Sequence, residues 1–356
     1  MADVPNIRAL LKNVVAYKAS DLHLVGKSEP QIRIDGKLVA VNFPKLDGTT
    51  IKEMCYSLIT DKQKKELEEK KELDFSIMLP EAGRFRVNYY YTIGNELAAA
   101  FRTIPLTVPT LEELKSPAIF KSIIKRERGL ILVTGPTGSG KSTTLAAMLN
   151  EINTTESKHI ITIEDPIEFV HQNKKSLFSM RGVGEETHSF TSALVHSLRE
   201  DPDIILVGEM RDRDTMSTAI TAAETGHLVF ATLHTTSAVQ TINRIIDSFE
   251  GNEQVQIRNM LSVSLTAIIS QALLPRIGGG RVGIFEILIT NPAIANLIRE
   301  DKVHQIYSQM QLNKSQSGMI TQTQSMIEAL KANLITKDDA SRHSTQLQEL
   351  LNLLGQ

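Results

Sequence analysis

The chain contains a single cysteine, Cys55, among 356 residues, and aromatic residues make up only 5% of it. One cysteine excludes an internal disulfide and a zinc site built from several cysteines, and it fits a protein of the reducing cytosol. Neither sign of charge is in large excess, since the formal net charge is −2. With few aromatic rings and no basic excess, the sequence disfavours nucleic-acid binding, which needs positive charge and stacking surfaces.

Long hydrophobic runs are also missing. The N-terminal residues lack the charged-then-apolar pattern of a signal peptide. The most apolar long stretch, Met260–Leu274, carries several polar residues and is too short to span a bilayer. We therefore expect a cytoplasmic protein without direct membrane insertion, whose contact with a membrane would go through a partner.

What the sequence does contain is the pattern of two domains, which its length also suggests. Residues 1–103 have the features of a small α+β domain with short alternating segments. Asp35-Gly36 is a hairpin signal between two of these segments, and the charged run Lys62–Lys71 predicts an exposed helix. The predicted strands are 21–25, 31–35, 37–41, 84–88 and 97–102.

A linker between the domains is expected at 104–117. Three prolines in this segment stiffen the chain and remove hydrogen-bond donors. Within the segment, Thr110 and Glu113 have the spacing of a capping box, which predicts a short helix.

From residue 118 to 356, apolar strands alternate with helical segments. This is the pattern of a parallel sheet covered by helices. From about residue 290 the tail is expected to be helical, with Thr336 and Asp339 as another capping box. The parallel strands are expected at 129–134, 160–163, 204–207 and 228–232.

Residues 135–142 read Gly-Pro-Thr-Gly-Ser-Gly-Lys-Ser, which is the G-x-x-x-x-G-K-[ST] spacing of a phosphate-binding loop. The glycines let the backbone turn its N–H groups toward one point, and the positive end of the following helix adds to this anion site. Lys141 can bridge the β- and γ-phosphates of a nucleoside triphosphate, and the Ser142 hydroxyl can bind Mg²⁺. The expected nucleotide-binding residues are Gly135, Pro136, Thr137, Gly138, Ser139, Gly140, Lys141, Ser142 and Thr143.

Three further polar residues, Glu164, Glu209 and His234, follow apolar strands. Because ligands bind at the carboxyl edge of a parallel sheet, we expect these residues and the phosphate-binding loop on one rim. Hydrolysis needs a water molecule to be oriented and deprotonated, and Mg²⁺ to be held against the phosphates. Glu164 is the better candidate for activating water. Glu209, preceded by Gly208 where an aspartate is usual, would organise Mg²⁺ through its water shell, although the two roles could be exchanged.

Two histidines lie at opposite ends of one predicted strand. In a straight strand His227 and His234 would be about 23 Å apart, at ~3.3 Å per residue, so both cannot touch one phosphate. His234 is expected to sense the γ-phosphate. His227 would be a conformational or interface residue, or else a hydrogen-bonded structural histidine.

Several arginines are candidates for neutralising charge in the transition state, a role that a neighbouring subunit can also supply. Arg84, Arg86 and Arg102 lie on predicted strands of the small domain. Arg211 and Arg213, just after Glu209, are competing candidates, with surface salt bridges as the other interpretation.

Together these segments resemble the secretion-type ATPases of the type II secretion and type IV pilus family. Its four motifs occur in order: a Walker A box (135–142), an Asp box (160–168), a Walker B box (201–212) and a His box (223–235). The resemblance covers nearly the whole chain.

Within that family the sequence is most similar to the pilus retraction motors. Extension and secretion members usually carry a four-cysteine zinc insert where this chain has the short segment Pro275–Arg281. Residues Ala293–Glu300 match a tail signature linked to retraction, with Ala295 in place of its first arginine.

The resemblance implies a homohexameric ring of subunits, each with a PAS-like small domain followed by a RecA-like ATPase domain. ATP and Mg²⁺ would bind between the two domains of one subunit, where Arg86 and Arg102 would close over the phosphates. Ser142 and Glu209 would be the Mg²⁺ ligands, the latter through water. Force would pass to a PilC-like platform protein of the inner membrane, where the motor would be peripheral, and pilins would be disassembled.

Other functions fit parts of the same pattern. The missing cysteines disfavour an extension motor, whereas an accessory retraction motor of the same family fits as well. A small-molecule kinase with a phosphate-binding loop would need an added acceptor for turnover. A RecA-like nucleic-acid translocase is disfavoured by the near-neutral charge.

Overall fold

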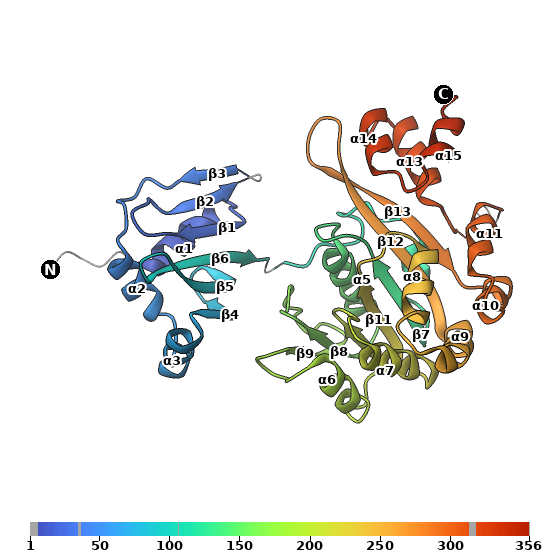
Figure 1. Cartoon of the computed structure of the whole chain (residues 1–356), viewed down its shortest axis with the longest axis horizontal. Helices are drawn as coiled ribbons and strands as arrows, with labels where there is room; N and C mark the ends of the chain where they lie inside the picture. Colours follow the sequence, from blue (N-terminus) through green and yellow to red (C-terminus); the bar gives the residue numbers. More distant parts are fainter. Residues whose placement is uncertain (1–5, 35–36, 106, 313–317, 356) are drawn as a thin grey trace. The chain divides into compact units, whose positions relative to one another are not determined.

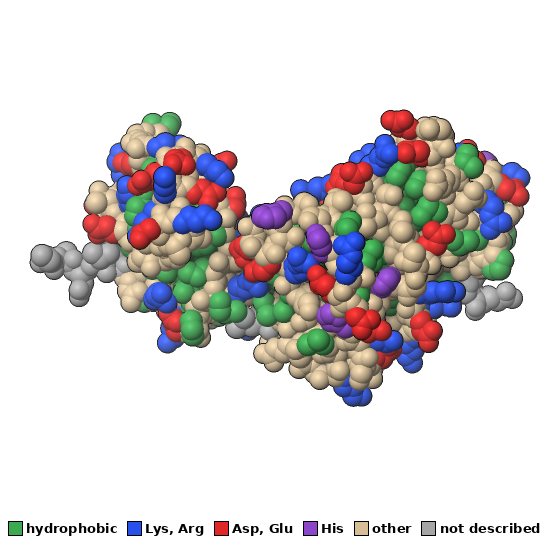
Figure 2. Space-filling model, turned by 90° about the horizontal axis from the view of Figure 1, so that it is seen from below, with side chains coloured by type: hydrophobic (Ala, Val, Ile, Leu, Met, Phe, Trp, Pro, Cys, Tyr) green, Lys and Arg blue, Asp and Glu red, His purple; other side chains and the backbone are tan. Residues whose placement is uncertain are grey.

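The computed structural model describes residues 6–34, 37–105, 107–312 and 318–355 (Figure 1). The chain forms two compact units, Met1–Thr107 and Val108–Gln356, and each is described here by itself. No helix among the described residues is both long and apolar enough to cross a bilayer. Figure 2 shows acidic and basic side chains interspersed over the visible face.

The first unit is built on a six-stranded sheet in the order β3-β2-β1-β6-β5-β4. Every pair of neighbouring strands is antiparallel. The five predicted strands are confirmed, and the sequence analysis missed only the edge strand β4. The strands are β1 (Asp21–Leu24), β2 (Gln31–Ile34), β3 (Lys37–Ala40), β4 (Glu72–Leu79), β5 (Gly83–Thr92) and β6 (Glu96–Ile104).

One face of this sheet is covered by helices α1 (Ile7–Ala16), α2 (Gly48–Tyr56) and α3 (Asp61–Lys70). The period of two along β5 sends Phe85, Val87 and Tyr89 into the core under these helices. The alternate residues of β5, including Arg84 and Arg86, therefore point to the opposite, open face.

Two local predictions for this unit can be compared with the structure. The charged run forms α3, which Thr60 and Gln63 cap reciprocally, and Leu67 is the helix's buried residue. The predicted turn at Asp35-Gly36 lies outside the described residues. The strands that flank it, β2 and β3, do pair antiparallel, with Ile34 opposite Lys37.

The proline-rich segment packs in part onto the second unit. Leu111 is buried in one cluster with Phe120 and Ile123. Thr110 and Glu113 exchange the expected capping hydrogen bonds. The residues between them nevertheless form a turn and not the predicted short helix. Lys115 adopts a positive φ of 52°, which lies outside the α-helical region, so a helix cannot continue through it.

The second unit is built on a seven-stranded sheet in the order β13-β12-β7-β11-β10-β8-β9. All neighbours are parallel except β12 and β13, which form an antiparallel hairpin. The four predicted parallel strands are confirmed. The strands are β7 (Gly129–Thr134), β8 (His159–Glu164), β9 (Leu177–Gly182), β10 (Ile204–Val207), β11 (Leu228–Leu233), β12 (Leu265–Pro275) and β13 (Arg281–Ile289).

Helices cover both faces of this sheet, as the continuous apolar strands require. Alternate residues of β7 divide between two cores: Leu130 and Leu132 face one, Ile131 and Val133 the other. The first core includes α6 (Phe190–Ser197), α7 (Arg213–Glu224), α8 (Ala238–Ile246), α9 (Gly251–Ser264) and α10 (Pro292–Arg299), and the second includes α4 (Ile119–Ile123) and α5 (Lys141–Thr155).

The described part of the C-terminal tail is helical, as expected. Figure 1 shows its last helices gathered beside the β12–β13 hairpin, with which they share a hydrophobic cluster. Half of the expected capping box is observed at the start of α14, where Asp339 N–H donates to the Thr336 hydroxyl; the Asp339 carboxylate accepts from that hydroxyl. The tail comprises η1 (Val303–Gln305), α11 (Ile306–Leu312), α13 (Gln322–Lys331), α14 (Lys337–His343) and α15 (Leu347–Leu353).

A buried carboxylate, Glu286 on β13, joins the tail to the rest of the second unit. Its side chain accepts the N–H of Ala238 at 2.8 Å and the N–H of Gln322 at 3.4 Å. These are the first residues of α8 and α13, where helix N–H groups otherwise lack partners. Burial raises the pKa of the Glu286 carboxyl, and the two N–H groups oppose that shift because they favour the ionised form.

Replacement of Glu286 by alanine should therefore destabilise the second unit by about 2–4 kcal/mol, because two buried N–H groups lose their acceptor. The measurement is the urea midpoint of unfolding followed by circular dichroism. Glu224→Ala, at an exposed position of α7, is the matched control and should change the midpoint little. Equal midpoints for the two variants would contradict this account of Glu286.

Candidate active site

The phosphate-binding loop connects β7 to α5, as its sequence context predicts. Gly135, Gly138 and Gly140 have φ values of 143°, 81° and 88°. Residues other than glycine rarely adopt positive φ values of this size. Gly140 precedes the first residue of α5 and provides no side-chain cap. The first N–H groups of this 15-residue helix are therefore left for an anion.

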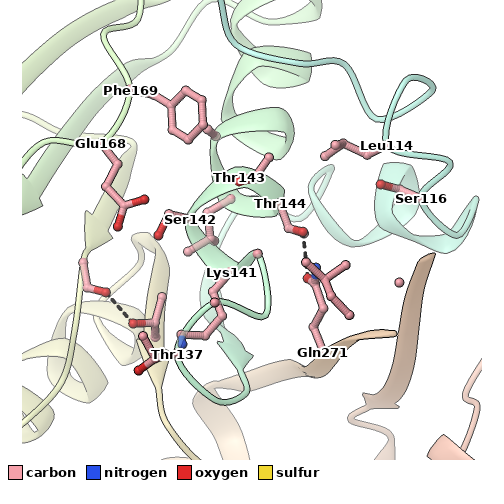
Figure 3. Close-up of a pocket in the computed structure, with 18 of the residues that line it drawn as sticks. Leu114, Ser116, Thr137, Lys141, Ser142, Thr143, Thr144, Glu168, Phe169 and Gln271 are labelled. Atoms are coloured by element: carbon pink, nitrogen blue, oxygen red, sulfur yellow. Dashed lines mark hydrogen bonds between the residues drawn. The ribbon is translucent and has the colours of Figure 1, made fainter. Parts of the chain in front are cut away.

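The loop rests on Gln271 of β12. A Cβ atom added at Gly135 would overlap the backbone oxygen of Gln271, so only glycine lets the loop lie this close. The Gln271 side chain also accepts a hydrogen bond of 2.7 Å from the Thr144 hydroxyl of α5 (Figure 3). Both ends of the loop are thus fixed to the neighbouring strand.

Lys141 lies folded against its own loop. Its ammonium group donates to the backbone oxygens of Gly135 at 2.8 Å and Pro136 at 3.2 Å. Burial lowers the pKa of Lys141, and the negative charges of Glu209 and Glu168 partly oppose that shift. The Lys141 ammonium group is therefore bound to the loop backbone and is attracted by the carboxylates of Glu209 and Glu168.

A cavity of about 780 Å³ opens over the loop. All the residues that line it belong to the second unit. Figure 3 shows Glu168 and Phe169 on one side of the start of α5, and Leu114 and Ser116 on the other. The polar lining includes Thr137, Lys141, Ser142, Thr143, Glu164, Glu168, Glu209, Thr232, His234, Gln271, Arg276 and Arg281.

The predicted rim forms at the carboxyl ends of β8, β10 and β11. These strands pair in parallel register, so Glu164, Glu209 and His234 come to the same edge and line the same cavity. Gly208 brings two of the strand ends close, since a Cβ atom there would lie only 3.1 Å from the Ile163 oxygen. An aspartate at 208 would press on the backbone of β8, which explains the glycine.

Glu209 is held at both carboxylate oxygens. Arg211 Nη2 lies 2.7 Å from Oε2, and His234 Nε2 lies 3.0 Å from Oε1. Burial alone would raise the pKa of Glu209, but the hydrogen bonds and charges of Arg211 and His234 outweigh it and leave the pKa below its usual value. Glu209 is therefore an oriented carboxylate that stays ionised at neutral pH.

Glu164 has a different environment. It is the last residue of β8, and one carboxylate oxygen accepts the N–H of Glu168 at 3.3 Å. It lines the same cavity as Glu209.

The comparison with known protein families decides the identity of this arrangement. The family model for type II/IV secretion system proteins matches residues 3–279.

The chain belongs to the type II/IV secretion system protein family.

Individual members of the family are similar over nearly the whole chain. A twitching motility protein of Neisseria gonorrhoeae is 50% identical over 346 residues, which are 97% of this chain and 92% of that protein. The type IV pilus retraction ATPase PilT of Pseudomonas aeruginosa is 51% identical over 335 residues, 94% of this chain and 97% of that protein. A crystal structure of the pilus retraction motor PilT with bound ADP matches with a TM-score of 0.92 at 48% identity, covering 98% of this chain and 99% of that one.

These relatives establish the family's fold and enzyme class for this chain. It has an antiparallel-sheet domain followed by a RecA-like ATPase domain, and it binds nucleotide and hydrolyses ATP. The glycine loop, the uncapped start of α5 and Lys141 have the features of the phosphate site that this activity requires.

Two predicted residues of the second unit, His227 and Arg213, do not line the cavity. His227 precedes β11 at its amino end, where its ring Nδ1 lies 3.0 Å from the Ala222 oxygen, and it does not line the cavity. Arg213 pairs with Glu253 at 2.6 Å, which is the salt-bridge interpretation. Arg86 and Arg102 belong to the first unit, on its open sheet face. An active role for these three arginines and for His227 stays a prediction.

The cavity residues that were not predicted include Gln271 and Glu168. Gln271 is a polar residue in the apolar stretch that forms β12, and that exception was the only signal for it. Its role depends on β12 pairing with β7, more than a hundred residues earlier, which the sequence pattern alone does not reveal. Glu168 lies in the predicted Asp box, but nothing in its spacing separates it from Glu164.

The fit of the loop on Gln271 predicts that Gly135→Ala will weaken nucleotide binding by about a hundredfold, because the methyl group would displace the loop. The measurement is ADP affinity by calorimetry. Gly226→Ala is the matched control: Gly226 also has a positive φ, of 124°, but open space around its Cβ position. Unchanged ADP affinity in Gly135→Ala would show that the loop does not depend on this contact.

Proposed function

We propose that this chain is the subunit of a homohexameric motor that couples ATP hydrolysis to type IV pilus retraction and twitching motility. The observation that carries the proposal is the joint position of Glu164, Glu209 and His234 at one edge of the sheet, beside the phosphate-binding loop. The proposal is supported by two relatives of about 50% identity whose names denote twitching motility and pilus retraction.

A Mg²⁺ ion is part of the proposal. Among the described residues, no cluster of three or more His, Cys, Asp or Glu side chains could hold a metal alone. An ion bound together with a nucleotide needs fewer protein ligands, because the phosphates and water supply the other oxygens. Ser142 would be a direct ligand and Glu209 a ligand through water, and the ion would neutralise charge on the β- and γ-phosphates.

The remaining chemistry is assigned to the residues of the rim. Glu164 would accept a proton from the attacking water, and His234 would donate a hydrogen bond to a γ-phosphate oxygen. Because His234 Nε2 already contacts Glu209, the γ-phosphate would be linked to the Mg²⁺-organising carboxylate through one side chain. Lys141 would leave its loop oxygens to bridge the β- and γ-phosphates.

The motor stroke would use the first unit. Arg86 and Arg102 would close over the phosphates, and the proline-rich segment would act as the hinge between a PAS-like and a RecA-like domain. Force would reach a PilC-like platform protein at the cytoplasmic face of the inner membrane and lead to disassembly of pilins.

We expect Glu164→Gln to reduce kcat by about 10²–10³ with little change in KM, because only proton abstraction is lost. Glu209→Gln should also slow hydrolysis, and it should raise the Mg²⁺ concentration needed for half-maximal rate. The measurements are steady-state ATPase assays and sizing of the purified hexamer, with Glu224→Gln as control. If Glu164→Gln raised the Mg²⁺ requirement and Glu209→Gln did not, Glu164 would be the residue that organises Mg²⁺ and Glu209 the one that activates water.

The same variants test the cellular function. Cells that lack the gene should be hyperpiliated and should not twitch, and a gene copy carrying Glu209→Ala should fail to restore retraction. Bald cells would indicate an extension motor, and normal retraction would indicate an accessory one. ATP turnover that depends on an added small-molecule acceptor, in a monomer or dimer, would favour a kinase.

A further inference from the structure

A row of charged side chains crosses the open face of the sheet in the first unit. Strand register places Asp21 directly opposite Arg33 on one side and Arg102 on the other. Arg102 is in turn directly opposite Arg86. Residues directly opposite one another in antiparallel strands point to the same face, so all four side chains belong to one row.

The acidic member of the row is buried, whereas its basic neighbour is exposed. Asp21 is only 6% exposed, while the Arg102 side chain is 68% exposed. Burial would raise the pKa of Asp21, but hydrogen bonds from Ser20 and Arg102 outweigh it and hold the pKa below its usual value. The carboxylate is therefore a fixed, ionised anchor.

The ion pair uses only one edge of the guanidinium group. Arg102 Nε donates to Asp21 Oδ1 at 2.8 Å. The other Asp21 oxygen accepts the Ser20 hydroxyl at 2.7 Å and lies 3.9 Å from Arg33 Nε. Arg102 forms no other hydrogen bond or ion pair within the described ranges, so its two terminal NH₂ groups remain available. Those two groups form the edge that binds a phosphate through two parallel hydrogen bonds.

Arg86 provides the contrast within the same row. Among the described residues it makes no side-chain hydrogen bond or ion pair, and it is exposed. Two arginines directly opposite one another repel, and Asp21 offsets this repulsion from one side only. One arginine is thus oriented before any ligand arrives, and the other is free to move.

We infer that Asp21 is a positioning residue for ATP hydrolysis, which holds the Arg102 guanidinium by its Nε edge so that the opposite edge faces the phosphates. This inference rests on the proposed role of Arg102 in closing over the nucleotide. Asp21 itself touches no reacting atom and acts through Arg102. Orientation before binding reduces the conformational freedom that Arg102 must lose when the phosphates arrive.

The test is a pair of double-mutant cycles measured as kcat for ATP hydrolysis by the full-length hexamer. Asp21→Ala and Arg102→Ala should each lower kcat by about tenfold or more, and the double variant should be no slower than Arg102→Ala alone. In the Arg86→Ala background, Asp21→Ala should keep its full effect. Asp21→Asn, which can still accept the Nε hydrogen bond but lacks the charge, should restore part of the lost rate.

Controls separate positioning from a merely structural role. ADP affinity and hexamer size should stay unchanged in Asp21→Ala. If Asp21→Ala does not fold, the same double-mutant cycles are measured with Asp21→Asn. Multiplicative losses in the Asp21/Arg102 cycle, or a normal rate in Asp21→Ala, would overturn the inference and leave the role of Arg102 intact. Normal hydrolysis by Arg102→Ala would instead remove the proposed role of Arg102, and the inference with it.

Discussion

The parallel pairing of β7, β8, β10 and β11 is the constraint on which the rest of the second unit depends. In such a sheet every strand ends at the same edge, so residues that follow different strands must meet there. The phosphate-binding loop, Glu164, Glu209 and His234 are brought together in this way. The helices on both faces then bury the strands, and the edge is left as the place where chemistry can occur.

The two carboxylates at that edge, Glu164 and Glu209, have different neighbours. Glu209 is held at both oxygens by Arg211 and His234, whereas one oxygen of Glu164 accepts the N–H of Glu168. The hydrogen bonds and charges of Arg211 and His234 hold the pKa of Glu209 below its usual value, as the proposed metal-organising role requires. In the first unit the signs of charge are reversed, since the Asp21 carboxylate orients Arg102, whereas Arg86 has no such side-chain partner among the described residues.

The parts that could be predicted from the sequence are those fixed by local pattern. The loop spacing, the apolar strands and the polar residues after them are sufficient to place Glu164, Glu209 and His234 on one rim, because the parallel-sheet rule needs no further information. Contacts between distant strands could not be predicted. Gln271 under the loop and Asp21 beside Arg102 depend on registers that join residues 81 or more positions apart. The turn at Leu111 differs from prediction because a positive φ at Lys115 outweighs the capping box.

The most direct test of the account is whether the rim distinguishes ATP from ADP through His234. The measurement is the affinity of the purified protein for ADP and for a non-hydrolysable ATP analogue, with His234→Ala compared with the exposed His196→Ala. We predict that His234→Ala binds ADP normally but loses about tenfold or more of its affinity for the analogue, the loss of one hydrogen bond to a charged group. An unchanged ratio of the two affinities would contradict the central claim that this edge of the sheet senses the γ-phosphate.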